Sequence, residues 1–285
     1  MKRADGIEIK KTDPMYKIAT YIMRERTDSM NTITLDIPLE PIQDYINKKR
    51  KEGVAISHMA VILAAYLQTV AEFPMLNRFV VNSKIFARNE LAVGMVVLKG
   101  SIFDHGTMSK MYFKPDNTIF EVNDIINKYV SDNRTENPDN PTEKIMDILL
   151  KVPGVMPIGV AILKWMDKHH LLPKAVVDMS PFHMSLGITN LASIRTGAIH
   201  HHCYNFGTTS VFIAMGMPHD VLKKVGDEIT AERCIPLGVV MDERICSGSY
   251  FALAFRKLKR LLKNPELLEQ KPEVLPDPEL PQKKK

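Results

Sequence analysis

The sequence predicts an α/β protein, because segments with the periodicity of strands alternate with segments that have the periodicity of helices. Residues 31–41 (NTITLDIPLEP) alternate polar and apolar side chains, which is typical of a half-buried strand. Residues 57–74 (SHMAVILAAYLQTVAEFP) are apolar on nearly all sides, which indicates a buried helix. Residues 249–268 carry one long apolar face, which predicts an amphipathic helix near the end of the chain.

The remaining elements follow from the same periodicities and from turn residues. In the first half, the pattern predicts a helix over 42–53, two strands over 78–88 joined at Asn82 and Ser83, and a strand over 91–100. In the second half, it predicts helices over 119–132 and 142–152 with a polar loop over 131–141, a helix after 154, and strands over 183–192, 209–217 and 234–244.

The composition is that of an ordinary globular protein. The chain has 285 residues, of which 45% are hydrophobic and 25% are charged, so it can form one large domain or two small ones. The net charge of +5 comes from 38 basic and 33 acidic residues that are spread through the chain, and no basic motif stands out. We therefore expect no nucleic acid among the partners.

The cysteines and the apolar segments favour a cytoplasmic location. Cys203, Cys234 and Cys246 are too few and too scattered for a disulfide framework, and none forms a C-x-x-C pair. The first residues lack the apolar run of a signal peptide. The most apolar stretch, 152–166, is interrupted by prolines and is too short to span a bilayer, so we expect no membrane contact.

One stretch near the end of the chain resembles a known family. Residues 239–268 read VVMDERICSGSYFALAFRKLKRLLKNPELL. They are similar to the closing segment of the dihydrolipoyl acyltransferase catalytic domain of 2-oxo acid dehydrogenase complexes. In that family a strand runs into D-H-R-x-x-D-G, and the next helix ends near N-P-E-x-L. Asp242, Arg244 and Gly248 stand at the matching positions here.

Other stretches extend the resemblance to residues 15–270 in the same order. They are KKRKEGVAISHMAVILAAYLQTVAEFPMLN (48–77), LAVGMVV (91–97), SLGITNLASI (185–194) and FGTTSVFIAMG (206–216). The resemblance implies the fold of chloramphenicol acetyltransferase, a mixed sheet flanked by helices and assembled as a homotrimer. Residues 1–14 are then an N-terminal extension, and the Pro-rich, Lys-rich residues 271–285 are expected to form a flexible tail.

The chain departs from the family pattern at positions that carry chemistry. Glu243 replaces the catalytic histidine, and Ser247 replaces the aspartate four positions further on. The family's P-R-G-L-V-V-P-V stretch is absent after Val97, where LKGSIFDHGTMSKMYF stands instead. No lipoyl domain precedes the catalytic region, so we expect no lipoyl group on this chain. The sequence is thus similar to a divergent stand-alone member with D-E-R in place of D-H-R.

The resemblance also implies a reaction and a set of site residues. In the family, histidine deprotonates the thiol of coenzyme A or dihydrolipoamide, and a hydroxyl group from the neighbouring subunit stabilises the oxyanion. By position, Thr189 supplies that hydroxyl group, and Asp242 and Arg244 hold the local structure. Coenzyme A or acyl-coenzyme A is the expected substrate, and a separate lipoyl-bearing or dehydrogenase-complex protein is a candidate partner. The residues expected to border coenzyme A are Asn190, Ser247 and Gly248.

The role of Glu243 stays open at the level of sequence. Proton transfer from a thiol of pKa about 8.5 to a glutamate of pKa about 4.3 is uphill by about 6 kcal/mol, against about 3 kcal/mol for histidine. Burial of the carboxyl group would raise its pKa and reduce this difference. Glu243 is either an altered base in an active acyltransferase or the ion-pair partner of Arg244 or another fixed cation in an inactive homologue. Such a homologue would serve as a trimeric scaffold or as a subunit that binds coenzyme A or acyl groups.

The run His200, His201, His202 and Cys203 is a second place for chemistry. Its spacing does not match the H-H-x-x-x-D-G motif of chloramphenicol acetyltransferase. It also lies well before the D-E-R sequence of residues 242–244. Neighbouring residues of a strand point to opposite faces, so only His200 and His202 could point to the same side. Two ligands are too few for a metal site of the usual kind, so we expect none. His201 or His202 is instead a candidate for the base that the D-E-R sequence lacks.

Overall fold

The computed structural model describes residues 3–98, 106–134 and 155–280. The helix predicted over 142–152 lies outside these residues, as does most of the predicted loop before it. In the part of the chain that is described, no helix is both long enough and apolar enough to cross a membrane.

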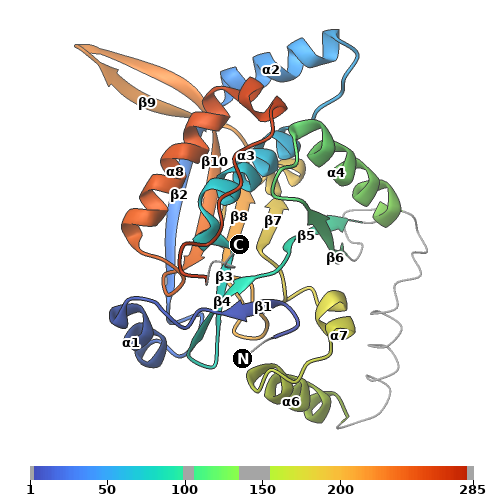
Figure 1. Cartoon of the computed structure of the whole chain (residues 1–285). Helices are drawn as coiled ribbons and strands as arrows, with labels where there is room; N and C mark the ends of the chain where they lie inside the picture. Colours follow the sequence, from blue (N-terminus) through green and yellow to red (C-terminus); the bar gives the residue numbers. More distant parts are fainter. Residues whose placement is uncertain (1–2, 99–105, 135–154, 281–285) are drawn as a thin grey trace.

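A mixed sheet forms the centre of the protein (Figure 1). Its strands β5, β7 and β8 run parallel to one another, and the other strands pair antiparallel. This arrangement confirms the mixed sheet that the resemblance implies. The order across the sheet is β2 (Met30–Pro38), β10 (Glu228–Asp242), β8 (Val211–Met215), β7 (Leu186–Asn190), β5 (Leu91–Leu98) and β6 (Gly106–Phe113), and β9 (His219–Val225) pairs with the first residues of β10.

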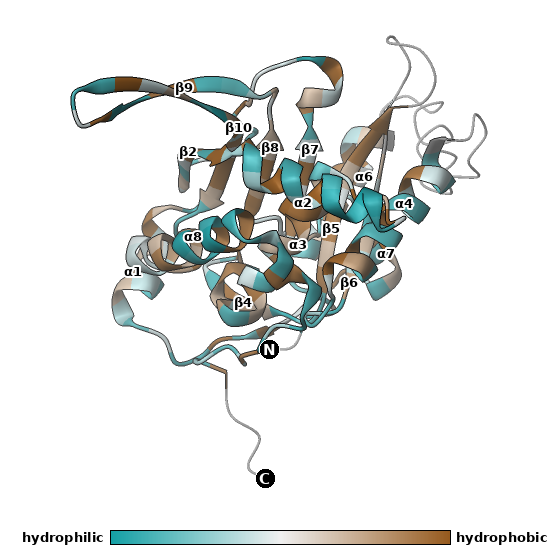
Figure 2. Ribbon diagram, turned by 90° about the horizontal axis from the view of Figure 1, so that it is seen from above, coloured by the Kyte–Doolittle hydropathy of each residue, from teal (hydrophilic) through white to brown (hydrophobic). Residues whose placement is uncertain are grey.

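Helices bury one face of this sheet, and Figure 2 shows the apolar strands beneath them. The predicted helix over 57–74 is confirmed as α3, whose residues from Met59 to Ala71 are all buried. The Ser57 hydroxyl oxygen caps its first turn by accepting a hydrogen bond from the Ala60 N–H at 3.1 Å. The helices on this face are α2 (Leu39–Lys51), α3 (His58–Glu72), α4 (Ile119–Arg134) and α8 (Gly248–Lys263), and the short helix η3 (Pro265–Glu269) follows α8.

A smaller sheet and three helices lie at the lower end of the molecule in Figure 1. Asn82 and Ser83 both adopt positive φ, at 49° and 56°, and so form the tight turn that the sequence predicts between two strands. The small sheet has the order β1 (Gly6–Glu8), β4 (Lys84–Arg88) and β3 (Arg78–Val81), and the helices are α1 (Pro14–Ile22), α6 (Val155–Lys168) and α7 (Lys174–Met179).

Both ends of the chain contribute to the folded core. Strand β1 pairs with β4, so residues within the expected N-terminal extension belong to a sheet. In the tail, Asp277 is 7% exposed and accepts a hydrogen bond from Arg78 Nε at 2.6 Å, and the Leu275 N–H donates to the Ala71 carbonyl at 2.8 Å. Residues 271–280 therefore depart from the flexible tail expected from composition, because a buried ion pair anchors them.

The segment between β7 and β8 crosses the face of the large sheet that the helices leave uncovered. We name residues 195–210 the histidine loop. A Cβ atom at Gly238 of β10 would collide with the Ile199 carbonyl oxygen, and one at Gly216 would collide with the Ala198 nitrogen. The absence of side chains at Gly216 and Gly238 therefore lets the histidine loop lie directly on the sheet.

Candidate active site

The D-E-R sequence forms a turn between the end of β10 and the start of α8, and two of its side chains are buried. Asp242 is 0% exposed and Arg244 is 2% exposed. Arg244 donates from Nε and Nη2 to the two carboxylate oxygens of Asp242, at 2.8 and 2.7 Å. A paired arrangement of this kind is among the strongest charge-assisted contacts, so Asp242 and Arg244 fix the shape of the turn.

A second guanidinium group, that of Arg26, also faces Asp242. Arg26 is 3% exposed, and its Nε lies 3.6 Å from Oδ2 of Asp242. Its other nitrogens donate to the Val80 carbonyl at 3.1 Å and to the Tyr204 carbonyl in the histidine loop. Burial lowers the pKa of Arg26, and the charge of Asp242 opposes this effect. Arg26 thus joins the turn to the histidine loop, a role that its position in the sequence does not reveal.

Glu243 lies between Asp242 and Arg244 in the sequence, but its side chain points toward Asn31. Its N–H donates to the Ser29 carbonyl at 2.9 Å, and its Oε2 accepts a hydrogen bond from Asn31 Nδ2 at 2.7 Å. The side chain is partly exposed. Because Arg244 is directed at Asp242, the ion pair between Glu243 and Arg244 considered from the sequence does not form. Among the described residues, no cation lies within 4.0 Å of the Glu243 carboxylate.

Ser247 and Gly248 begin helix α8. The Ser247 hydroxyl oxygen accepts a hydrogen bond from the Tyr250 N–H at 3.1 Å, which is the contact of an N-cap residue. Gly248 is the first residue of the helix and is exposed. At the position of the family aspartate, this chain therefore has a helix cap.

Thr189 and Asn190 lie at the end of β7, away from the turn. Thr189 is the neighbour of Ala214 in β8, and Ala214 is the neighbour of Gly238 in β10. Asp242 lies four residue steps beyond Gly238 along β10, which is about 13 Å, and two strand spacings add about 10 Å across the sheet. Thr189 and the turn of the same chain are thus about 16 Å apart. Asn190 caps the short helix η2 (Leu191–Ile194) through a hydrogen bond from the Ser193 N–H at 3.2 Å.

The histidine loop runs along β2 between these two places. A ring nitrogen of His200 lies 3.2 Å from the Thr34 hydroxyl oxygen. Thr34 is the strand partner of Gly238. The Cys203 N–H contacts the sulfur of Met30 at 3.1 Å, and Met30 is the strand partner of Asp242. The loop therefore reaches the turn.

The imidazoles of the loop are held by aromatic packing. The His201 ring stacks on Phe212 at a centroid distance of 4.2 Å and on His202 at 5.1 Å. His201 Nδ1 lies 2.9 Å from the His202 carbonyl oxygen, so this nitrogen carries the proton. In the described part of the chain, no hydrogen bond or ion pair joins either ring to Glu243.

The thiols and the metal-binding side chains offer no further reactive centre. Burial raises the pKa of Cys203 to about 12 and also raises that of Cys246, so both thiols stay protonated near neutral pH. Across residues 3–98, 106–134 and 155–280, no three His, Cys, Asp or Glu side chains are grouped so as to hold a metal ion.

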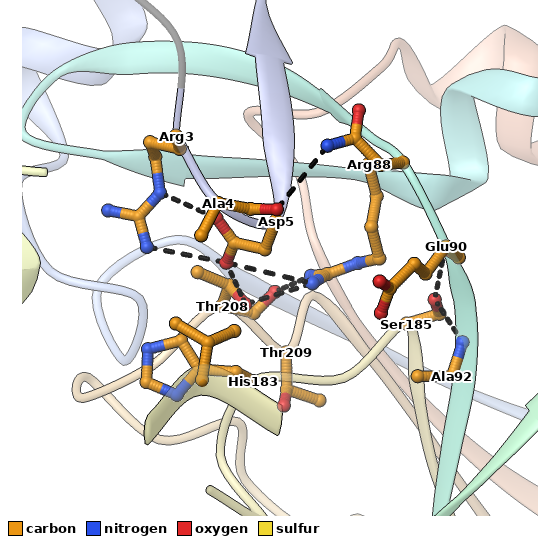
Figure 3. Close-up of polar contacts among 12 residues, drawn as sticks. Arg3, Ala4, Asp5, Arg88, Glu90, Ala92, His183, Ser185, Thr208 and Thr209 are labelled. Carbon is orange, nitrogen blue, oxygen red and sulfur yellow. Dashed lines mark hydrogen bonds and ion pairs between the residues drawn. The ribbon is translucent and has the colours of Figure 1, made fainter. Parts of the chain in front are cut away.

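A buried polar network holds the far end of the histidine loop (Figure 3). Arg88 donates to the carbonyl and hydroxyl oxygens of Thr208, at 2.6 and 3.1 Å. Arg3 donates to Asp5 at 2.8 Å and to Asp167 at 2.6 Å. These residues come from five distant parts of the sequence when His183 is included, and for this reason sequence patterns do not reveal the network.

Comparisons with known proteins identify the fold. No protein-family model and no curated protein matches the sequence. A probable dihydrolipoamide acetyltransferase from Listeria monocytogenes 4b F2365 has a TM-score of 0.56 and 14% identity, over 89% of this chain and 94% of that one. The cubic core of the pyruvate dehydrogenase multienzyme complex has a TM-score of 0.58 and 12% identity, over 92% and 93%. A chloramphenicol acetyltransferase has a TM-score of 0.52 and 10% identity, over 90% and 98%.

Because these identities are low, the comparisons establish the fold only. The chemistry of the site has to be argued from the residues of this chain. The likeness covers nearly the whole length of this chain and of the matched chains. The protein has the chloramphenicol acetyltransferase-like fold that is found in the catalytic cores of dihydrolipoamide acetyltransferases.

Proposed function

We propose that the protein is a coenzyme A-dependent acyltransferase in which Glu243 takes the place of the family histidine in proton transfer. The observation that carries this proposal is the state of the Glu243 carboxylate. It is partly exposed, it is oriented by the amide of Asn31, and it stands on a turn that Asp242 and Arg244 hold rigid. A carboxylate kept in this way has one oxygen without a partner in the described chain, which suits exchange of a proton with a substrate.

The position of Thr189 supports a site shared between subunits. Within one chain this hydroxyl group is about 16 Å from the turn, too far to act on the same carbonyl group. In a homotrimer of the kind that the fold implies, Thr189 of one subunit would face Glu243 of the next and would donate a hydrogen bond to the oxyanion. Asn190, Ser247 and Gly248 would then border coenzyme A from the two sides of the interface.

A second function is favoured by the same hydrogen bond from Asn31. This hydrogen bond fixes the Glu243 side chain to the neighbouring strand β2, as a purely structural contact would. The protein would then be a non-catalytic trimeric subunit that binds coenzyme A or acyl groups and acts beside a lipoyl-bearing or dehydrogenase-complex protein. The two functions differ in whether Glu243 takes part in turnover.

Incubation with acetyl-coenzyme A and with thiol, amine and alcohol acceptors separates these functions. We expect acyl transfer that falls by about 100-fold or more in Glu243→Gln. The exposed Glu273 supplies the control variant Glu273→Gln, which should keep full activity. Loss of turnover in His201→Ala or His202→Ala but not in Glu243→Gln would move the base to the histidine loop. Absence of turnover, with coenzyme A still raising the melting temperature, would favour the binding subunit.

A further inference from the structure

We infer that the acceptor of the acyl group is an amine and not a thiol or an alcohol. This inference rests on the proposed function, because it assigns a substrate class to the site at Glu243. Two observations support it. The proton carrier at the turn is the Glu243 carboxylate, and the nearby arginines and the imidazoles of the histidine loop are engaged in other contacts.

No cation of the described residues forms an ion pair with the Glu243 carboxylate. The two guanidinium groups beside the turn, those of Arg26 and Arg244, are both directed at Asp242 and at backbone carbonyl groups. The contact that the described chain gives to the Glu243 side chain is the neutral amide of Asn31. An uncompensated carboxylate attracts a cation, and a primary amine approaches as its ammonium form near neutral pH.

The imidazoles of the histidine loop are engaged in other contacts, and that of His202 stacks on the ring of His201. His200 bonds to Thr34, and His201 is stacked on Phe212 with its Nδ1 proton donated to a carbonyl group of its own loop. A carboxylate is therefore the proton carrier that the turn offers. A carboxylate, with an ordinary pKa of about 4.3, is a weaker base than an imidazole of about 6.5, and it is weaker still relative to a thiolate of about 8.5.

This weakness disfavours a thiol as the attacking group and favours a thiol as the leaving group. A carboxylate does not readily deprotonate a thiol, and it deprotonates an alcohol even less readily, whereas a carboxylic acid readily protonates a thiolate. The ammonium form releases its proton to solvent before attack, and the neutral amine is then a nucleophile that needs no further base. Its proton becomes acidic only after the nitrogen atom has bonded to the carbonyl carbon.

The reaction can be written with all atoms balanced. The amine nitrogen attacks the thioester carbonyl carbon, and the carbonyl oxygen takes the electron pair as an oxyanion. Glu243 then accepts one proton from the ammonium nitrogen of the adduct. The oxyanion re-forms the carbonyl group, the carbon–sulfur bond breaks, and Glu243 returns the proton to the departing thiolate. The products are an amide and free coenzyme A, and the carboxylate is regenerated.

A matched series of acceptors tests this inference: 2-phenylethylamine, 2-phenylethanethiol and 2-phenylethanol share one skeleton and differ in the nucleophile. With acetyl-coenzyme A and the full-length protein, we expect amide formation to exceed thioester and ester formation by at least about tenfold above the uncatalysed rates, measured by mass spectrometry. The rate should rise with pH as the free amine is released. Glu273→Gln should leave this preference unchanged.

Glu243→His is the sharpest variant, because it restores a base suited to thiols. We expect it to shift the ratio of thioester to amide toward thioester by at least about tenfold. Faster transfer to the thiol than to the amine by the unmodified protein would overturn the amine acceptor and leave the acyltransferase function standing. No transfer to any of the three acceptors would overturn the acyltransferase function itself, and the amine acceptor with it.

Discussion

At the scale of single residues, the charged side chains at the end of β10 fall into two groups. Asp242 and its arginines are paired with one another, and Glu243 is not paired with a cation of the described chain. Asp242 is compensated by Arg244 and Arg26, and all three side chains are buried. Glu243 stands between Asp242 and Arg244 in the sequence, and its side chain faces Asn31 and solvent. Loss of one partner of a buried pair leaves an uncompensated charge, so Asp242 and its cations act as one unit.

Removal of Arg26 should release the histidine loop from the turn. In Arg26→Gln the charge near Asp242 and the donor to the Tyr204 carbonyl are both lost. Hydrogen bonds from a charged donor contribute about 1.5–3 kcal/mol, so amide exchange in residues 200–205 should accelerate by roughly tenfold or more. Hydrogen exchange followed by mass spectrometry measures this effect, with exposed Arg24→Gln as the control. Unchanged protection in Arg26→Gln would show that the loop is held without it.

The sequence identified the turn but not its contacts. Asp242, Glu243 and Arg244 were predicted as site residues, and the structure describes them as one turn. The partners Arg26 and Asn31 were not predicted, because their side chains meet the turn only through the pairing of β2 with β10. Asn31 and Glu243 are separated by 212 positions along the chain, and no local pattern links residues so far apart.

At the scale of elements, strong periodicity was a reliable guide and weak periodicity was not. The buried helix α3 and the amphipathic helix α8 were predicted from their apolar faces. Strand β9 was not predicted, because nearly all of its residues are exposed and no polar–apolar alternation marks a buried face. Strand β10 starts earlier than the predicted segment 234–244 for the same reason, since its first residues pair only with β9.

The close approach of the histidine loop to the sheet makes Gly238 a sensitive position. In Gly238→Ala the new methyl group would meet the Ile199 carbonyl, and the backbone of the loop would have to move. We expect a loss of about 1–3 kcal/mol in the free energy of unfolding, as for other overpacked sites. Gly197 lies in the same loop with no atom within 4 Å of an added Cβ, so Gly197→Ala is the matched control. Equal stability of the two variants in urea unfolding would contradict the tight packing.

At the scale of the whole molecule, residues near the two ends of the chain and helix α6 are tied to the core by buried charges. Arg3 donates to Asp167 of α6, and Asp5 accepts a hydrogen bond from Thr208 in the histidine loop. Arg78 binds Asp277 of the tail. The composition of residues 271–285 suggested a flexible tail, and the structure instead places a salt bridge between Arg78 and Asp277 there, which periodicity does not reveal.

Acid should weaken the network that contains Asp167. Burial alone would raise the pKa of Asp167, but the contact with His183, whose Nε2 lies 3.3 Å from Oδ1, and the charge of Arg3 lower it to about 2. A carboxyl group whose folded-state pKa is depressed stabilises the protein above its unfolded pKa, and this stability is lost as the pH falls through the folded pKa. From an ordinary value near 3.8, the shift corresponds to about 2 kcal/mol, lost between about pH 5 and pH 2.

Chemical unfolding as a function of pH measures this contribution. The slope between pH 5 and pH 2 should be smaller in Asp167→Asn than in the unmodified protein, and unchanged in the control Asp220→Asn, whose carboxylate is exposed. Identical slopes in Asp167→Asn and the unmodified protein would show that another carboxylate governs acid stability.

The account as a whole depends on Glu243 acting in a site that two subunits share. Mixing Glu243→Gln subunits with Thr189→Ala subunits tests this most directly. Each variant alone should lose about 100-fold or more of the acyl transfer activity. In randomly mixed trimers, about a quarter of the interfaces pair an intact Glu243 with an intact Thr189, so about a quarter of the activity should return. Mixed trimers confirmed by native mass spectrometry that remain inactive would contradict the shared site.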